Sequence, residues 1–290
     1  MRPKRRWRKV LYFLLGLVMA YFAGCFYLAS KYVRPGVAND GPIPKGFHES
    51  AQPNAWVSDD LAKTKDVFVL VHGYGGNQFG WSDVAKRLTA KGYGVVIPAL
   101  PGHDNRVAET SGFAEKESTE VARTVDWVRI EAKPGARIAL VGVSMGGAAC
   151  WLATSKTSNI DAIATEGCFA RLEPATKRWF DRKAPGASVY LAPVIWFAKR
   201  MSEVDPSTIN PVEAAANWRG KPSLVIHGSD DQLFDIADAK ALAKESGGEL
   251  WIVQGAGHAH CSDMDCDAYI DHLTKLLDHV SPGTESTASP

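Results

Sequence analysis

The sequence has 290 residues, of which 46% are hydrophobic and 22% are charged, which is ordinary for a globular protein. This length is ample for one sizeable hydrophobic core. The formal net charge of +1 gives no support to nucleic-acid binding by the protein as a whole, and none is expected.

Charge is distributed unevenly at the N-terminus. Residues 1–9 contain six Lys or Arg and no acid, and the 21 residues 10–30 contain no charge. A helix of that length is about 30 Å long, which matches the hydrocarbon core of a bilayer. We predict a basic cytoplasmic segment at 1–9 and a single-pass transmembrane anchor at 10–30. The positive-inside rule then places everything after Lys31 on the periplasmic or extracytoplasmic side.

Two other interpretations of this segment stay open. A cleaved signal peptide would have a shorter apolar region followed by a small-residue cleavage site. The run FAGC, ending at Cys25, is similar to a lipoprotein signal. Phe22 fits that signal poorly, however, and the residues after Cys25 remain apolar. An uncleaved anchor is therefore the prediction, with cleavage as the alternative.

Residues 31–55 are rich in Pro and Gly and are predicted to form a tether. From Trp56 onward the pattern changes to short runs of Val, Ile and Leu with little alternation. Such runs are typical of strands that are buried on both faces of a parallel sheet. The runs are DVFVLVHG (66–73), YGVVIPAL (93–100), RIALVGVS (137–144), IDAIATEG (160–167), PSLVIHG (222–228) and ELWIVQG (249–255).

Helical stretches separate these runs, so strand and helix alternate through a domain predicted at 56–280. This alternation indicates a doubly wound α/β sheet that is mostly parallel. Residues from about 168 to 217 break the rhythm and contain several aromatic residues and prolines, so we predict a helical insertion there. The polar tail 281–290 is predicted to be disordered.

The strongest chemical signal is GVSMG, in which Ser144 lies between Gly142 and Gly146. It stands at the end of an apolar strand and the start of a helix. A nucleophilic serine needs a tight, strained turn there, and glycine two positions to either side avoids clashes. The helix N-terminus also favours developing negative charge. Ser144 is therefore the predicted nucleophile.

A serine nucleophile needs an acid and a base, which should follow it along the chain in that order. The run LVIHGSDDQLF ends a late strand, and its Asp231 is the predicted acid, with Asp230 and Glu166 as alternatives. His258 follows the last strand in GAGHAH and is the predicted base, because the unperturbed pKa of imidazole lies near neutrality. His260 is the alternative base.

An oxyanion hole is expected from two backbone N–H groups. One belongs to the residue after the nucleophile, Met145, and the other to the loop HGYGG after an earlier strand, where Tyr74 is the best candidate. The glycines would let this backbone approach a substrate oxygen closely. His72, at the end of the apolar strand, is predicted to be structural.

The chain at this point resembles the α/β-hydrolase superfamily, and within it the membrane-anchored or secreted serine hydrolases with an N-terminal hydrophobic segment. The motifs that carry the resemblance run in family order over residues 56–280. They are VHGYGGN, GYGVVIPALPGHDNR, TSGFAEKESTEVARTVDWV, LVGVSMGGA, KPSLVIHGSDDQLF and GAGHAH. The resemblance implies an α/β-hydrolase fold, a Ser144–Asp231–His258 triad and a lid at about 168–217. PGHDNR departs from the many relatives that have Gly and Ser after this His, which would change a loop beside the site.

The leading hypothesis is a serine hydrolase without metal or cofactor that acts on a small acyl substrate. A carboxylic ester is the default bond, and thioester, amide or peptide cleavage remains open. The aromatic lid suggests an apolar acyl chain. A catalytically idle binding protein of the same fold is a further alternative.

The segment GAGHAHCSDMDC also permits a metal site, although its spacing matches no zinc pattern. Its candidate ligands are His258, His260, Cys261, Asp263, Asp265 and Cys266. In an oxidising compartment Cys261 and Cys266 could instead form a disulfide, since their separation permits that geometry without ensuring it.

Overall fold

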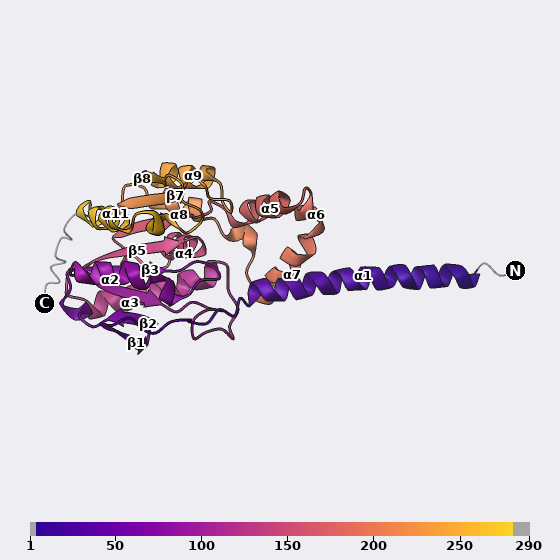
Figure 1. The fold of residues 1–290 in the computed structure, drawn as a ribbon, viewed down its shortest axis with the longest axis horizontal. Coiled ribbons are helices and arrows are strands. Elements are labelled where there is room, and N and C mark those ends of the chain that lie inside the picture. Colours follow the sequence, from indigo (N-terminus) through magenta and orange to yellow (C-terminus); the bar gives the residue numbers. More distant parts are fainter. Residues whose placement is uncertain (1–3, 281–290) are drawn as a thin grey trace.

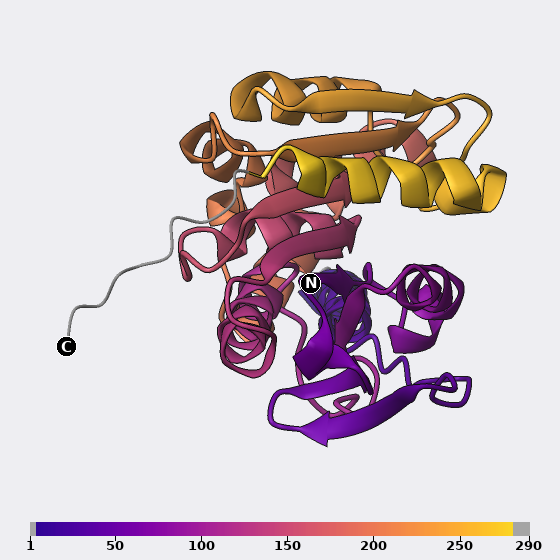
Figure 2. The same cartoon turned by 90° about the vertical axis from the view of Figure 1, so that its left-hand side faces the viewer.

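The computed structural model describes residues 4–280, in which an eight-stranded sheet lies between two layers of helices (Figures 1 and 2). The strand order is β1-β2-β4-β3-β5-β6-β7-β8, with β1 and β2 antiparallel at one edge and the other six strands parallel. The strands are β1 (Phe47–Ala51), β2 (Asn54–Ser58), β3 (Asp66–Val71), β4 (Gly94–Pro98), β5 (Arg137–Val143), β6 (Ala162–Glu166), β7 (Ser223–Gly228) and β8 (Glu249–Val253). All six predicted strands are present, so the doubly wound α/β sheet is confirmed.

Local signals explain several helix ends. The side chain of Asp265 accepts the N–H of Ala268 at 2.9 Å and caps the start of α11, while Gly247 ends α9 in the left-handed conformation with φ of 71°. Gly92 does the same after α2. The α-helices are α1 (Lys4–Val33), α2 (Ser82–Ala90), α3 (Glu115–Glu131), α4 (Met145–Ala153), α5 (Leu172–Lys183), α6 (Ala187–Tyr190), α7 (Ala192–Ser202), α8 (Pro211–Asn217), α9 (Ile236–Ser246), α10 (Cys261–Met264) and α11 (Cys266–Asp278).

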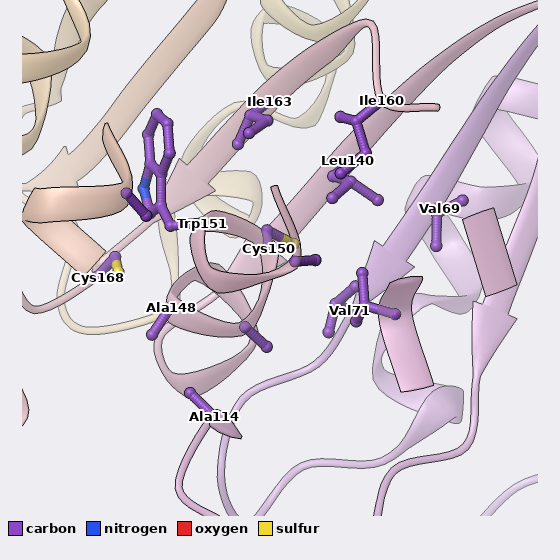
Figure 3. Close-up of a cluster of buried hydrophobic side chains, with 14 of the residues drawn as sticks. Val69, Val71, Ala114, Leu140, Ala148, Cys150, Trp151, Ile160, Ile163 and Cys168 are labelled. Atoms are coloured by element: carbon purple, nitrogen blue, oxygen red, sulfur yellow. The ribbon is translucent and has the colours of Figure 1, made fainter. Parts of the chain in front are cut away.

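The sheet separates two hydrophobic cores, because successive side chains of a strand point to opposite faces. Val69 of β3 faces the core that contains α3, α4, α8 and α9, and Phe68 faces the core that contains α2 and α11. Figure 3 shows Cys150 of α4 near Leu140 of β5 and Trp151 on the side of the same helix that faces Cys168, and both α4 side chains are fully buried. This packing fixes α4, and with it the turn that carries Ser144.

The predicted tether at 31–55 is wrong at both ends. Residues 31–33 still belong to α1, and residues 47–55 lie in the β1–β2 hairpin, which pairs with β4. β1 has the sequence FHESA, which is short and polar as edge strands often are. Such a strand lacks the apolar run by which the six parallel strands were recognised.

The predicted insertion at 168–217 is also too long. Residues 172–202 form helices α5, α6 and α7, which project from the sheet (Figure 1). We refer to these three helices as the lid. Helix α8 instead packs against α4 and α9 and belongs to the core. The prediction failed there because a prolyl loop and a short helix give no local sign of which layer they join.

Helix α1 extends away from the domain as a rod (Figure 1). Over Arg6–Val33 it is long and apolar enough to span a membrane. The last turns of α1 pack against the rest of the protein, where Cys25, Ala29 and Val33 are buried against α7. The predicted tail at 281–290 lies outside the described residues.

Candidate active site

The turn between β5 and α4 holds Ser144 in a strained conformation, with φ of 55° and ψ of −118°. A Cβ at Gly142 would lie 2.5 Å from the backbone oxygen of Gly146, and one at Gly146 would lie 2.3 Å from that of Val71. Both positions therefore require glycine. The N–H of Ser144 donates to the carbonyl oxygen of Glu166 at 2.8 Å, which ties the turn to β6.

Three predicted residues meet at the carboxyl ends of the parallel strands. Ser144 Oγ lies 3.0 Å from His258 Nε2, and His258 Nδ1 lies 2.7 Å from Asp231 Oδ2. The other carboxylate oxygen, Oδ1, accepts the N–H groups of Leu233 at 2.7 Å and Phe234 at 3.0 Å. The Asp231 side chain is 1% exposed and that of His258 is 21% exposed. The acid is thus buried and fixed, while the imidazole borders the cavity.

The surroundings of Asp231 keep its carboxyl group ionised. Burial alone would raise its pKa, but the hydrogen bond and charge of His258, together with two backbone N–H groups, lower the pKa below its ordinary value. A carboxylate on Nδ1 favours the tautomer with its proton there. The free electron pair of Nε2 then faces Ser144 Oγ, as a general base requires.

The alternative acids and base lie elsewhere. Asp230 is exposed and its carboxylate accepts the hydroxyl of Ser229 at 2.8 Å. His260 is exposed and pairs with Asp263 at 2.6 Å. Glu166 is buried, and its carboxyl oxygen accepts the N–H of Cys261 at 2.8 Å. Glu166 therefore supports both sides of the site, since its carbonyl oxygen holds the Ser144 turn.

The two predicted oxyanion donors lie on the wall of the same cavity. Tyr74 and Met145 both line it, and neither backbone N–H has a hydrogen-bond partner within residues 4–280. A Cβ at Gly73 would lie 3.1 Å from Ser144 Cβ, so the loop passes directly beside the serine. Glycine at 73 therefore permits the close approach that an oxyanion hole needs.

A histidine network holds this loop, and the sequence did not reveal it. The N–H of Gly75 donates to His103 Nε2 at 3.1 Å, while His103 Nδ1 lies 2.9 Å from the carbonyl oxygen of Pro101. Burial, and then the neighbouring His72, lower the pKa of His103 to about 4, so it is a neutral acceptor at neutral pH. His72 is structural as predicted: it is buried and bonds Asp104 at 2.9 Å. In the sequence, PGHDNR stands out only as a departure from related proteins. The contact of its His103 with Gly75 could not be predicted, because the two residues are 28 positions apart.

A cavity of about 570 Å³ adjoins Ser144 and His258. Its wall combines the core domain with α1, α5 and α7, and it is mostly apolar. The lining side chains include Tyr32, Phe113, Trp179, Phe180, Val194 and Phe234.

All five cysteines lie within residues 4–280 and are unpaired there, so this part of the chain contains no disulfide between Cys261 and Cys266. Cys261 is buried, and this burial is the main reason that the pKa of its thiol is raised. The acidic groups around it raise the pKa further. Within residues 4–280 no three His, Cys, Asp or Glu side chains converge as metal ligands would. The segment 255–266 therefore supplies a histidine to the serine site.

The profile of the alpha/beta hydrolase family matches residues 68–272. No curated protein matches the sequence. Among solved structures, an esterase from Pyrococcus furiosus is 18% identical, with a TM-score of 0.61 over 79% of this chain and 87% of that chain. A lipase-esterase related protein from Clostridium acetobutylicum is also 18% identical, with a TM-score of 0.58 over 80% of this chain and 99% of that chain. These similarities show a common fold.

Proposed function

The chain belongs to the alpha/beta hydrolase family, and from this premise we propose that it is a serine hydrolase that cleaves carboxylic esters. The observation that carries the proposal is the continuous contact from Ser144 through His258 to the buried carboxylate of Asp231. The similarity to solved esterases supports the choice of ester over other acyl bonds.

The proposed reaction begins when Ser144 Oγ attacks the acyl carbon and His258 Nε2 takes its proton. The N–H groups of Tyr74 and Met145 hold the oxyanion, and each is worth about 3 kcal/mol. His258 then gives the proton to the leaving alkoxide, which departs as an alcohol. In the second half His258 takes a proton from water, the hydroxide releases the acyl group as an acid, and Ser144 regains its proton.

A fluorophosphonate probe tests the nucleophile directly. We expect stoichiometric labelling of the wild-type protein and none of Ser144→Ala, with ester hydrolysis lost in the same variant. Matched 4-nitrophenyl ester, thioester and anilide substrates then test the bond, and the ester should react fastest. Full ester turnover by Ser144→Ala would overturn the serine mechanism, whereas no turnover by the wild-type protein would favour the idle binding protein.

We further propose that α1 is retained as a membrane anchor, with the domain on the extracytoplasmic side. Cys25, Ala29 and Val33 pack against α7, and Tyr32 lines the cavity next to the serine. Removal of a signal peptide ending in this region would take away part of that wall. The basic residues of 1–9 favour a cytoplasmic N-terminus.

The intact mass of the protein purified from membranes tests this point. We expect the full 31.4 kDa chain, resistant to carbonate extraction, and digestion of the domain by protease added outside the cell. A shortened, soluble chain would contradict the anchor and leave the triad proposal untouched.

A further inference from the structure

The outer part of the lid is an uncharged segment with large exposed side chains. The thirteen residues 186–198 contain no charge, and Lys183 and Lys199 are the nearest charged residues on either side. Within this segment Val189, Tyr190 and Trp196 are 73%, 71% and 54% exposed. A soluble surface seldom presents so many large apolar side chains together, so this surface calls for a partner.

Helix α7 runs beside α1 in the same direction (Figure 1). The hydroxyl of Tyr21 donates to the carbonyl oxygen of Tyr190. Further along both helices, the rings of Phe26 and Phe197 meet edge to face with centroids 5.4 Å apart. In both contacts a later residue of α1 meets a later residue of the lid. The position of a residue in α6 or α7 can therefore be expressed as a depth along α1.

That depth lies within the apolar run of α1. Tyr21 stands nine residues before Ser30, the last residue of the uncharged run, which is about 14 Å along a helix. The hydrocarbon layer of one leaflet, half of the bilayer core, is about 15 Å thick. Tyr190, in contact with Tyr21, would therefore lie deep in the leaflet next to the domain.

The charges agree with this depth. Arg200 lies three residues after Phe197, and Lys31 lies five residues after Phe26, which is about 4.5 and 7.5 Å along the two helices. Both cations therefore stand near the end of the apolar run. The guanidinium of Arg200 lies over the ring of Trp196, 5.5 Å from its centroid. Cations and an indole ring at one level are typical of a membrane–water interface and suit anionic headgroups.

We propose that α6 and the first half of α7 are embedded in the same leaflet as the C-terminal half of α1, and that the site takes long-chain acyl esters from that leaflet. This inference rests on the proposed serine hydrolase and its anchor. The cavity connects the two parts, because Tyr32 of α1 and Val194, Ile195 and Ala198 of α7 line it together with Ser144. An acyl chain would therefore pass along helices that already stand in lipid.

Spin-label accessibility tests the depth of the lid. Val189→Cys is labelled in a Cys266→Ser background, because Cys266 is the one cysteine that is not buried. The full chain is reconstituted in vesicles of phosphatidylethanolamine and phosphatidylglycerol. We expect high collision rates with oxygen and low rates with a water-soluble nickel complex. Lys133→Cys, on an exposed loop of the domain, should give the reverse.

Two other readings from Val189 would overturn the proposal. Ready access of the nickel complex would mean that the lid lies in water. Poor access of both reagents would mean that another protein, or a second copy, covers this surface instead of lipid.

A pair of substrates tests the route of the acyl chain. We compare 4-nitrophenyl palmitate held in the vesicles with 4-nitrophenyl acetate in solution, which share a leaving group. The double variant Val189→Asp/Trp196→Asp places one charge deep in the leaflet and a second close to its interface, while both positions lie outside the cavity wall. The palmitate rate should fall about tenfold or more, since each charge strongly opposes insertion. The acetate rate should stay within about twofold.

Ile130→Asp is the matched control, because Ile130 is 79% exposed on α3, away from α1 and the lid. It should leave both rates within about twofold. Equal palmitate rates in the wild-type protein and the double variant would overturn the lateral route. No acetate hydrolysis by the wild-type protein would instead count against the proposed hydrolase, so the two failures are distinguishable.

Discussion

Replacing Asp231 by Asn would reverse a hydrogen bond while hardly changing shape. Oδ1 accepts two backbone N–H groups, so in Asp231→Asn the amide oxygen should occupy that position. The NH₂ group then takes the place of Oδ2, 2.7 Å from His258 Nδ1, and it can only donate. His258 must therefore accept at Nδ1 and carry its proton on Nε2, where it cannot take one from Ser144.

We expect kcat for 4-nitrophenyl acetate to fall about 10⁴-fold, because a tautomer reversed in this way costs that much in serine proteases. This corresponds to about 5 kcal/mol of transition-state stabilisation. Asp230→Asn, one residue away and exposed, is the matched control and should keep kcat within about twofold. A thermal melt of both variants checks that each is folded. A folded Asp231→Asn protein with kcat within tenfold of wild type would refute the argument that Asp231 sets the tautomer.

Three further predictions follow from the surroundings of the site. Gly146→Ala should lower the free energy of unfolding by about 1–3 kcal/mol in urea titrations, because its Cβ would meet backbone oxygens at 2.3 and 2.4 Å. Gly80→Ala, where a Cβ meets nothing within 4 Å, should show no such loss. The pKa of His103 is lowered to about 4, so the unfolded chain binds the extra proton between about pH 6.5 and 4. The stability that neutral His103 contributes is therefore complete above that window and is lost as pH falls. Between pH 7 and pH 5 the wild type should lose about 2 kcal/mol more than His103→Gln, and equal losses would contradict this. A thiol titration of denatured protein without reductant should find five free thiols, whereas three would restore the disulfide between Cys261 and Cys266.

The candidate site was predictable because its parts are marked by local patterns. Ser144 lies between two glycines that its turn requires, and Asp231 and His258 each follow an apolar run. Parallel strands end at the same edge of a sheet, so residues far apart in sequence converge there once the strands are recognised. The sequence favoured Asp231 but left Asp230 open, and the fold separates them, since Asp231 contacts His258 whereas Asp230 is exposed.

The sequence by itself determined the six parallel strands, the strained serine turn and the apolar N-terminal helix, because periodicity and turn chemistry act over a few residues. Only the tertiary structure decided that the β1–β2 hairpin completes the sheet, that His103 holds Gly75 and that α1 shares a cavity with the lid. Each of these depends on contacts between distant segments, which leave no repeated pattern in the chain. The packing of α1 on α7 has the largest consequence, because it places the proposed anchor in the wall of the proposed active site.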